Sequence, residues 1–294
     1  MSELYSDRAA EVGKLGATLS RAVSGKILRA LMAAVERGKD VHQESYGPMV
    51  PDSTLCEPGT DVRVLGIGSG SGESDSIILK KLLQRHNSVY SRVVEPSGEM
   101  IKRYKALVRE DTSLGAVKFD WRQQTAEEYF QTKEGTKFHL AHAVHVLYNV
   151  EDHDATLRNM WEQLANGGYM FLVMQSDKGD WGGLRHKLWE EFGQGDRLKT
   201  WFRTSGDVKQ CLDRAGISYV TTENEADINV TECFREKSEA GKLLLDFLTH
   251  TPYVSSEPEI RSMVLEYIRC NSSLVDDRLI FKTMNEAILS LKTV

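Results

Sequence analysis

Four glycines at alternate positions follow a short apolar run and mark the part of this sequence with the clearest chemistry. The run Val62–Ile67 leads into the turn, and another apolar stretch, Ile77–Leu83, comes shortly after it. A strand that turns through glycines into a helix lets the backbone approach a ligand closely and adopt positive φ. The turn therefore predicts a nucleotide-type site; its glycines are Gly66, Gly68, Gly70 and Gly72.

A carboxylate ends the next apolar run along the chain. Ser91–Val94 leads directly into Glu95, about twenty residues after the glycine turn. An acid at the tip of the second strand is placed to accept hydrogen bonds from a ribose diol. The turn and this acid together predict a ligand that contains a ribose.

The spacing of the glycines and the charges beside them narrow the choice of ligand class. A dinucleotide fingerprint needs a glycine five residues after the first, but Ser71 and Glu73 stand at those positions, and no Lys-Ser or Lys-Thr of a P-loop follows. Glu73 and Asp75 would repel a pyrophosphate. S-adenosylmethionine, with its ribose, sulfonium and ammonium, fits better; a purely structural glycine turn is the alternative.

Histidines at and beyond the apolar stretch Phe138–Val144 raise two further questions. Alternation along a strand sends His139 and His145 to one face and His142 to the other, so we expect no metal site here. His145 directly follows the strand, and its ordinary pKa near 6.5 suits a general base or a hydrogen-bond donor to substrate. The alternative is a histidine that is satisfied at the edge of the sheet.

These residues need an alternating α/β frame to come together. Apolar runs and amphipathic segments alternate from residue 62 to residue 174, which predicts a mostly parallel sheet with helices on both faces. Further strands are expected over 217–222 and over 279–283 with 288–291. We also expect a turn over 180–183 followed by a helix over 184–192, and an apolar helix over 240–248. In the alternating part we expect strands over 62–67, 91–94, 117–121, 138–144 and 169–174, and helices over 74–85, 98–109 and up to Gly167-Gly168.

The chain is long enough for one large domain. Its 294 residues contain no linker that would divide them, so we expect a single domain over 1–294. An N-terminal helical cap is expected over 1–45, and elements on the substrate side over 175–215 and 225–275.

Composition and charge exclude several classes of protein. The formal net charge of −6 argues against nucleic acid as the main partner, and the lack of an apolar run long enough to cross a membrane argues against a membrane protein. The four cysteines match no metal-binding spacing and suit a reducing compartment. The first residues lack a signal-peptide core. We expect a cytoplasmic monomer that acts on a small molecule.

These motifs resemble those of class I, Rossmann-like S-adenosylmethionine-dependent methyltransferases, and more narrowly those of the histamine N-methyltransferase family. The resemblance implies a seven-stranded, mostly parallel sheet with a small substrate-binding embellishment. It is collinear over nearly the whole chain, in segments 4–7, 65–73, 93–97, 117–119, 146–150, 187–189 and 244–249.

The resemblance also implies roles for single residues. Gly66 with Gly68 and Gly70 would contact the methionine part of the cofactor, Glu95 the ribose, and the pair Thr125 and Ala126 the adenine. Val144 and His145 would face the reaction centre. The aromatic residues that would enclose an amine substrate are Tyr148, Trp189 and Phe247.

The substrate half of the family pattern differs at three polar positions. Ser24 takes the place of the family glutamate that pairs with the substrate ammonium, and His145 takes the place of a family glutamine. Lys282 or Thr283 takes the place of an asparagine, and a lysine facing the pocket would disfavour a cationic amine. The resemblance therefore predicts a small amine or imidazole acceptor without singling out histamine. An O-methyltransferase with His145 as base, and a cofactor-binding protein without turnover, are the alternatives.

Overall fold

The computed structural model describes residues 50, 61–192, 203–249, 251 and 254–293. The expected N-terminal cap with Ser24, and most of the loop before the first strand, lie outside the described residues. The described part forms two compact units. We call the described residues 50, 61–177, 203–224 and 285–293 the sheet unit, and the described residues 178–192, 225–249, 251 and 254–284 the helical unit.

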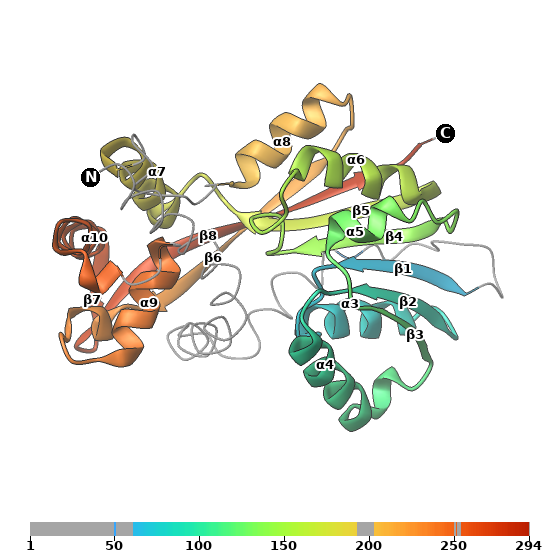
Figure 1. Cartoon of the computed structure of the whole chain (residues 1–294), viewed down its shortest axis with the longest axis horizontal. Helices are drawn as coiled ribbons and strands as arrows, with labels where there is room; N and C mark the ends of the chain where they lie inside the picture. The colour runs from blue at the N-terminus through green and yellow to red at the C-terminus, as the bar shows by residue number, and fades with distance from the viewer. Residues whose placement is uncertain (1–49, 51–60, 193–202, 250, 252–253, 294) are drawn as a thin grey trace, which may run out of the picture. The chain divides into compact units, whose positions relative to one another are not determined.

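The sheet runs in the order β3-β2-β1-β4-β5-β8-β6, and β7 pairs with β8 beside this path (Figure 1). The first five strands pair in parallel, whereas β8 (Arg278–Leu291) is antiparallel to β5. The prediction of a mostly parallel α/β sheet is thus confirmed. The path holds the seven strands that were expected, and β7 adds an eighth in the described part of the chain. The parallel strands are β1 (Val62–Ile67), β2 (Val89–Val94), β3 (Val117–Arg122), β4 (Phe138–Val144) and β5 (Leu164–Gln175).

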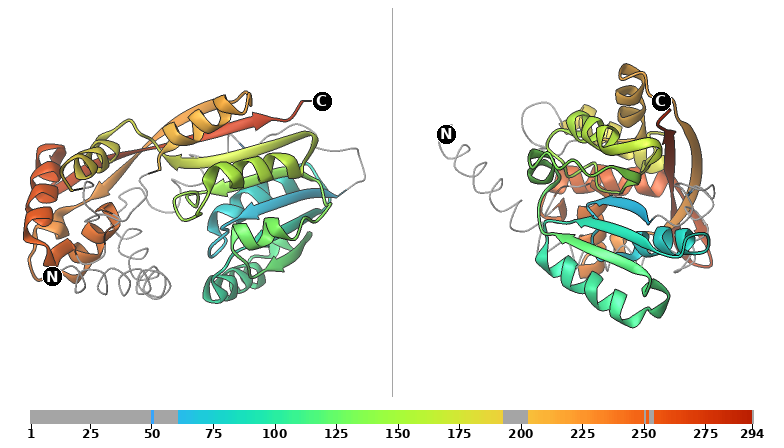
Figure 2. Two further views of the ribbon diagram at one scale, coloured as in Figure 1. Left: turned by 45° about the horizontal axis from the view of Figure 1, so that its top comes forward. Right: turned by 90° about the vertical axis from the view of Figure 1, so that its right-hand side faces the viewer.

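Helices cover both faces of the sheet, as Figures 1 and 2 show. Side chains alternate along each strand, so Leu65 and Ile67 of β1 pack on one face and Val62 and Val64 on the other. The first face packs under α5, α6 and α8, and the second under α3. The helices of this unit are α3 (Glu73–Leu83), α4 (Gly98–Glu110), η2 (Thr112–Leu114), α5 (Ala126–Gln131), α6 (His153–Gln163) and α8 (Ser205–Arg214).

Three predicted boundaries near the end of the sheet were wrong. α6 stops at Gln163 and β5 begins at once. Gly167 N–H donates to the Lys292 carbonyl and Lys292 N–H donates to the Gly168 carbonyl, so the sheet continues through the glycine pair that was expected to end the helix. The two short strands expected after residue 278 form one continuous strand, β8. It is continuous because β7 pairs with its first part and β5 pairs with its later part. β6 (Val220–Asn229) is also longer than expected.

The helical unit contains the expected apolar helix, α9 (Glu239–Thr249). α7 (Asp180–Phe192) contains the helix expected over 184–192 and also takes in the turn that was predicted over 180–183. It starts earlier because Gly183 N–H donates to the Gly179 carbonyl and so closes the first helical turn. α10 and β7 were not predicted from the sequence. The other elements here are η3 (Thr231–Phe234), η4 (Val254–Ser256), α10 (Pro258–Cys270) and β7 (Ser272–Val275).

None of the helices in the described ranges is both long and apolar enough to cross a membrane.

Candidate functional site

The glycine loop between β1 and α3 takes a backbone path that side chains would obstruct. Gly68, Gly70 and Gly72 all have positive φ, at 65°, 56° and 90°. A Cβ on Gly68 would lie 2.0 Å from a methyl of Val146, and one on Gly72 would lie 2.1 Å from the ring of Tyr104. The loop therefore needs glycine both for its conformation and for its packing.

Glu95 lies where β2 ends and faces the glycine loop. Its Oε2 accepts a hydrogen bond from Gly70 N–H at 3.0 Å, and its Oε1 accepts one from Ser97 N–H at 2.8 Å. The residue is 8% exposed, and burial raises the pKa of its carboxyl although the two main-chain bonds oppose this. Each oxygen keeps a further lone pair, so the carboxylate is held ready for the two hydroxyls of a ribose.

The two acids of the loop have different surroundings. Glu73 is exposed and accepts a hydrogen bond from Ser71 Oγ at 2.7 Å. Asp75 is buried beneath Gly66, and its Oδ1 lies 3.8 Å from Nε2 of His142. Burial raises the pKa of Asp75 and lowers the pKa of His142. The first turn of α3 carries Asp75 under the loop, so the expectation that Asp75 would repel a pyrophosphate beside the loop was wrong. For Glu73 the expectation stays a prediction.

Thr125 and Ala126, expected beside the adenine, begin α5. The Thr125 hydroxyl accepts from Glu128 N–H at 3.1 Å, and the Glu128 carboxylate accepts from Thr125 N–H at 2.9 Å. This reciprocal pair is a capping box. The hydroxyl thus fixes the start of the helix, and Ala126 is buried against the sheet.

Thr125→Ala should lower the free energy of unfolding by about 1 kcal/mol, because the main-chain donor of Glu128 loses its acceptor. Thr125→Ser keeps the hydroxyl and should stay within about 0.5 kcal/mol of the parent protein. Urea denaturation of the two variants measures the difference. Equal stabilities would contradict the capping role.

The structure brings His145 and Tyr148 together just beyond β4. Nδ1 of His145 lies 3.0 Å from the Tyr148 hydroxyl, which also accepts a hydrogen bond from Gln175 N–H at 2.6 Å. His145 has a φ of 52°, and its N–H donates to the Val173 carbonyl at 2.9 Å. Val144, the last residue of β4, precedes this turn. A histidine in the left-handed region is uncommon and is a candidate functional feature.

The other three predicted substrate residues belong to the helical unit. Phe247 packs against Trp181, with ring centroids 5.2 Å apart. Trp189 is 49% exposed. Lys282 Nζ lies 3.5 Å from Oε2 of Glu225, so its charge has an acidic neighbour.

Ser97 and Val146 are residues of the site that the sequence analysis missed. Ser97 caps α4 through its side chain and binds Glu95 through its main-chain N–H, which a serine before a helix could have signalled. Val146 closes over Gly68 from a loop distant in sequence, and a single sequence carries no signal for that contact.

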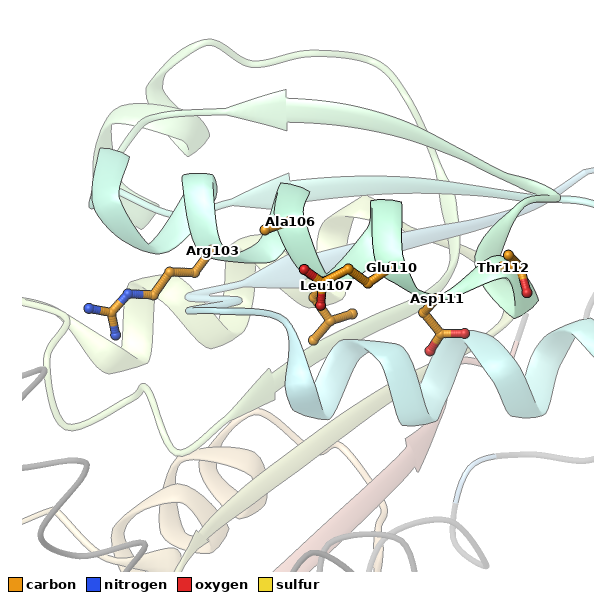
Figure 3. Close-up of a pocket in the computed structure, with 6 residues that line it drawn as sticks. All are labelled: Arg103, Ala106, Leu107, Glu110, Asp111 and Thr112. Atoms are coloured by element: carbon orange, nitrogen blue, oxygen red, sulfur yellow. The ribbon is translucent and has the colours of Figure 1, made fainter.

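An open hollow of about 650 Å³ lies along the later part of α4 (Figure 3). None of the predicted site residues lines it, and Asp111 at its rim is paired with Lys80. The hollow therefore adds nothing to the site. Its lining residues are Arg103, Ala106, Leu107, Glu110, Asp111 and Thr112.

Residues 17–222 match the family described as "Methyltransferase domain". The fold and the glycine loop agree with that match, and the chain is a methyltransferase. Two relatives narrow the class. The histamine N-methyltransferase of Xenopus tropicalis is 37% identical over 207 residues, which cover 68% of this chain and 69% of the relative. That of Cavia porcellus is 34% identical over 215 residues, covering 70% and 73%. The chain belongs to the histamine N-methyltransferase family.

Solved structures support the fold alone. The YcgJ protein from Bacillus subtilis aligns with a TM-score of 0.54 at 14% identity, covering 86% of this chain and 98% of its own. A putative methyltransferase from Bacillus halodurans aligns with a TM-score of 0.53 at 14% identity, covering 82% and 96%.

S-adenosylmethionine is the cofactor, and the residues present fit it. Nothing lies within 4 Å of a Cβ built on Gly70, so the loop backbone is open to close approach at that residue. Glu95 offers a carboxylate already oriented by two main-chain donors. When bound, the cofactor supplies an electrophilic methyl group on a sulfonium.

Proposed function

We propose that this enzyme transfers the methyl group to a nitrogen of a small amine or imidazole metabolite. The observation that carries the proposal is the family: the similar proteins are named histamine N-methyltransferases and match about 70% of the chain. The resemblance aligns Ser24 with the family glutamate that pairs with the substrate ammonium, so we propose that this enzyme does not recognise its substrate through a carboxylate at that position.

The proposed chemistry asks the protein for alignment and for the right protonation state. Methyl transfer is an in-line displacement, and the attacking nitrogen must be neutral. His145 is the proposed proton acceptor or hydrogen-bond partner of the substrate, and Tyr148 is proposed to orient its ring through Nδ1. Tyr148, Trp189 and Phe247 are the proposed aromatic walls, which favour positive charge as it passes from sulfur to nitrogen.

The acidic neighbours of Lys282 weaken the argument that this lysine would disfavour a cationic amine. Its ammonium has Glu225 at 3.5 Å. Burial raises the pKa of the nearby Asp180, while Lys282 opposes that rise and Glu225 adds to it. The lysine is therefore one positive charge beside two acids, which removes the objection that Lys282 would repel an ammonium.

Titration calorimetry with S-adenosylmethionine, followed by mass spectrometry of a panel of amines, imidazoles and hydroxyl compounds, tests the proposal. We expect cofactor binding and a methylated nitrogen on at least one amine or imidazole. Methylation of hydroxyl compounds alone would favour the O-methyltransferase alternative. Binding without turnover on any acceptor in the panel or in cell extract would favour a non-catalytic protein.

His145→Ala should lower kcat/KM about 100-fold at neutral pH, since loss of a general acid–base group typically costs this much. If the side chain acts only as a base, activity of the variant should recover as the pH rises and the acceptor deprotonates by itself. A loss that persists at high pH would show that His145 also orients the acceptor. His186→Ala, at an exposed histidine paired with Glu190, is the control and should keep full activity.

We also propose that the enzyme works as a monomer in the cytoplasm without a nucleic-acid partner. The net charge of −6 argues against a nucleic-acid partner. Cys211, Cys233 and Cys270 are free thiols, which suits a reducing compartment. Light scattering of the purified protein and fractionation of the cells that produce it test these points.

A further inference from the structure

Arg203 holds the loop that follows β4 by its main chain. Arg203 is only 6% exposed. Its Nη1 donates to the carbonyls of Leu147 at 3.1 Å and Val150 at 2.5 Å, and its Nη2 donates to the carbonyl of Glu151 at 2.7 Å. One guanidinium thus binds three carbonyls of a single loop.

The loop it holds carries two of the proposed site residues and touches the cofactor loop. Tyr148 lies between the carbonyls bound by Arg203, and its hydroxyl meets Nδ1 of His145. Val146, in the same loop, is the neighbour that excludes a side chain at Gly68. Any shift of this loop therefore moves His145 and Tyr148 relative to the glycine loop.

The arginine itself stands on a rigid support. It directly precedes Thr204, whose N–H donates to the Asp207 carboxylate at 2.7 Å in the capping box of α8. α8 packs into the core of the sheet unit through Val208 and Leu212, both fully buried. The guanidinium thus ties the loop after β4 to a helix that is fixed by the core.

We propose that Arg203 is a positioning residue for methyl transfer, setting the place of His145 and Tyr148 through its bonds to the loop carbonyls. This inference rests on the proposed function, since it takes those two residues as part of the substrate site. The planar fork of arginine reaches several acceptors at once, whereas a lysine ammonium at this position cannot reproduce the fork. A misplacement of about 1 Å in such a site is enough to cost up to about 100-fold in rate.

Arg203→Lys should therefore lower kcat about tenfold or more while the Kd for S-adenosylhomocysteine changes less than about threefold. Arg214→Lys is the matched control: Arg214 lies on α8, its side chain is 60% exposed, and it pairs with Asp154. The control should keep the kcat of the parent enzyme. Thermal melting of both variants separates a loss of folded protein from a loss of rate, and Arg203→Gln serves if the lysine variant does not fold.

A double-mutant cycle tests whether Arg203 acts through Tyr148. In a Tyr148→Phe background, Arg203→Lys should cause little further loss of activity. The bond from the Tyr148 hydroxyl that orients His145, which Arg203 holds in place, is already absent there. A normal kcat in Arg203→Lys, a loss that follows the folded fraction alone, or fully additive losses in the cycle would overturn the inference. An inactive parent enzyme on every acceptor would instead overturn the proposed function, which keeps the two failures distinct.

Discussion

Gly68→Ala is expected to lower the free energy of unfolding by about 4 kcal/mol and to abolish measurable cofactor binding. Two separate penalties add at this position. A φ of 65° places a side chain in the left-handed region, which costs roughly 1–2 kcal/mol. The new Cβ would also lie 2.0 Å from Val146, and relieving that overlap costs about 1–3 kcal/mol.

Gly216→Ala isolates the first of these penalties. Its φ is 67°, and nothing lies within 4 Å of a Cβ built there, so only backbone strain is added. Urea denaturation should place its loss near 1–2 kcal/mol. Val146→Ala combined with Gly68→Ala should recover part of the difference by making room for the methyl. Equal losses at Gly68 and Gly216 would show that the contact with Val146 does not matter.

Local patterns predicted the elements of the cofactor half well. β1, β2, β4 and α3 lie within a few residues of their expected places, because apolar runs bounded by glycine or acid are strong local signals. The fold class follows from their alternation. The position of Glu95 at the tip of β2 follows as well, since a strand end is fixed by the residues next to it.

Distant contacts decided what was missed. β8 is one strand because β5 and β7 pair with different parts of it, and those partners are not visible in its own sequence. Asp75 is buried because α3 begins at Glu73 and turns it beneath Gly66.

α10 was missed although its own sequence carries local helix signals. Pro258 stands in its first turn, and Ile260, Val264 and Ile268 form a buried stripe along it.

The candidate site also combines contacts that are local in sequence with contacts between distant segments. The pairing of His145 with Tyr148 is local in sequence, but the bond from Gln175 N–H that fixes the tyrosine comes from the end of another strand. The clamp by Arg203 depends on a side chain from beyond β5. Residue types and spacing thus indicated which groups do chemistry, whereas the groups that hold them in place required the tertiary structure.

Glu95→Ala should raise the Kd for S-adenosylhomocysteine roughly 1000-fold. Two hydrogen bonds from ribose hydroxyls to a charged acceptor are worth about 4 kcal/mol together, which corresponds to this factor. Glu95→Gln should also bind weakly, because its NH₂ group would face a main-chain donor, either Gly70 N–H or Ser97 N–H. Glu110→Gln, at an exposed glutamate on α4, is the control and should leave the Kd unchanged.

The same carboxylate predicts how binding depends on pH. Burial raises the pKa of Glu95 above its usual value, so its proton is taken up at a higher pH than in an exposed glutamate. The ionised form accepts the ribose hydrogen bonds, and affinity should therefore be full above this raised pKa and should fall as the pH drops through it. Calorimetry across the acidic range should show this decline in the parent protein and a flatter profile in Glu95→Gln. Matching profiles in the two proteins would mean that another group carries the pH dependence, and the role of Glu95 would then rest on its hydrogen bonds to the loop alone.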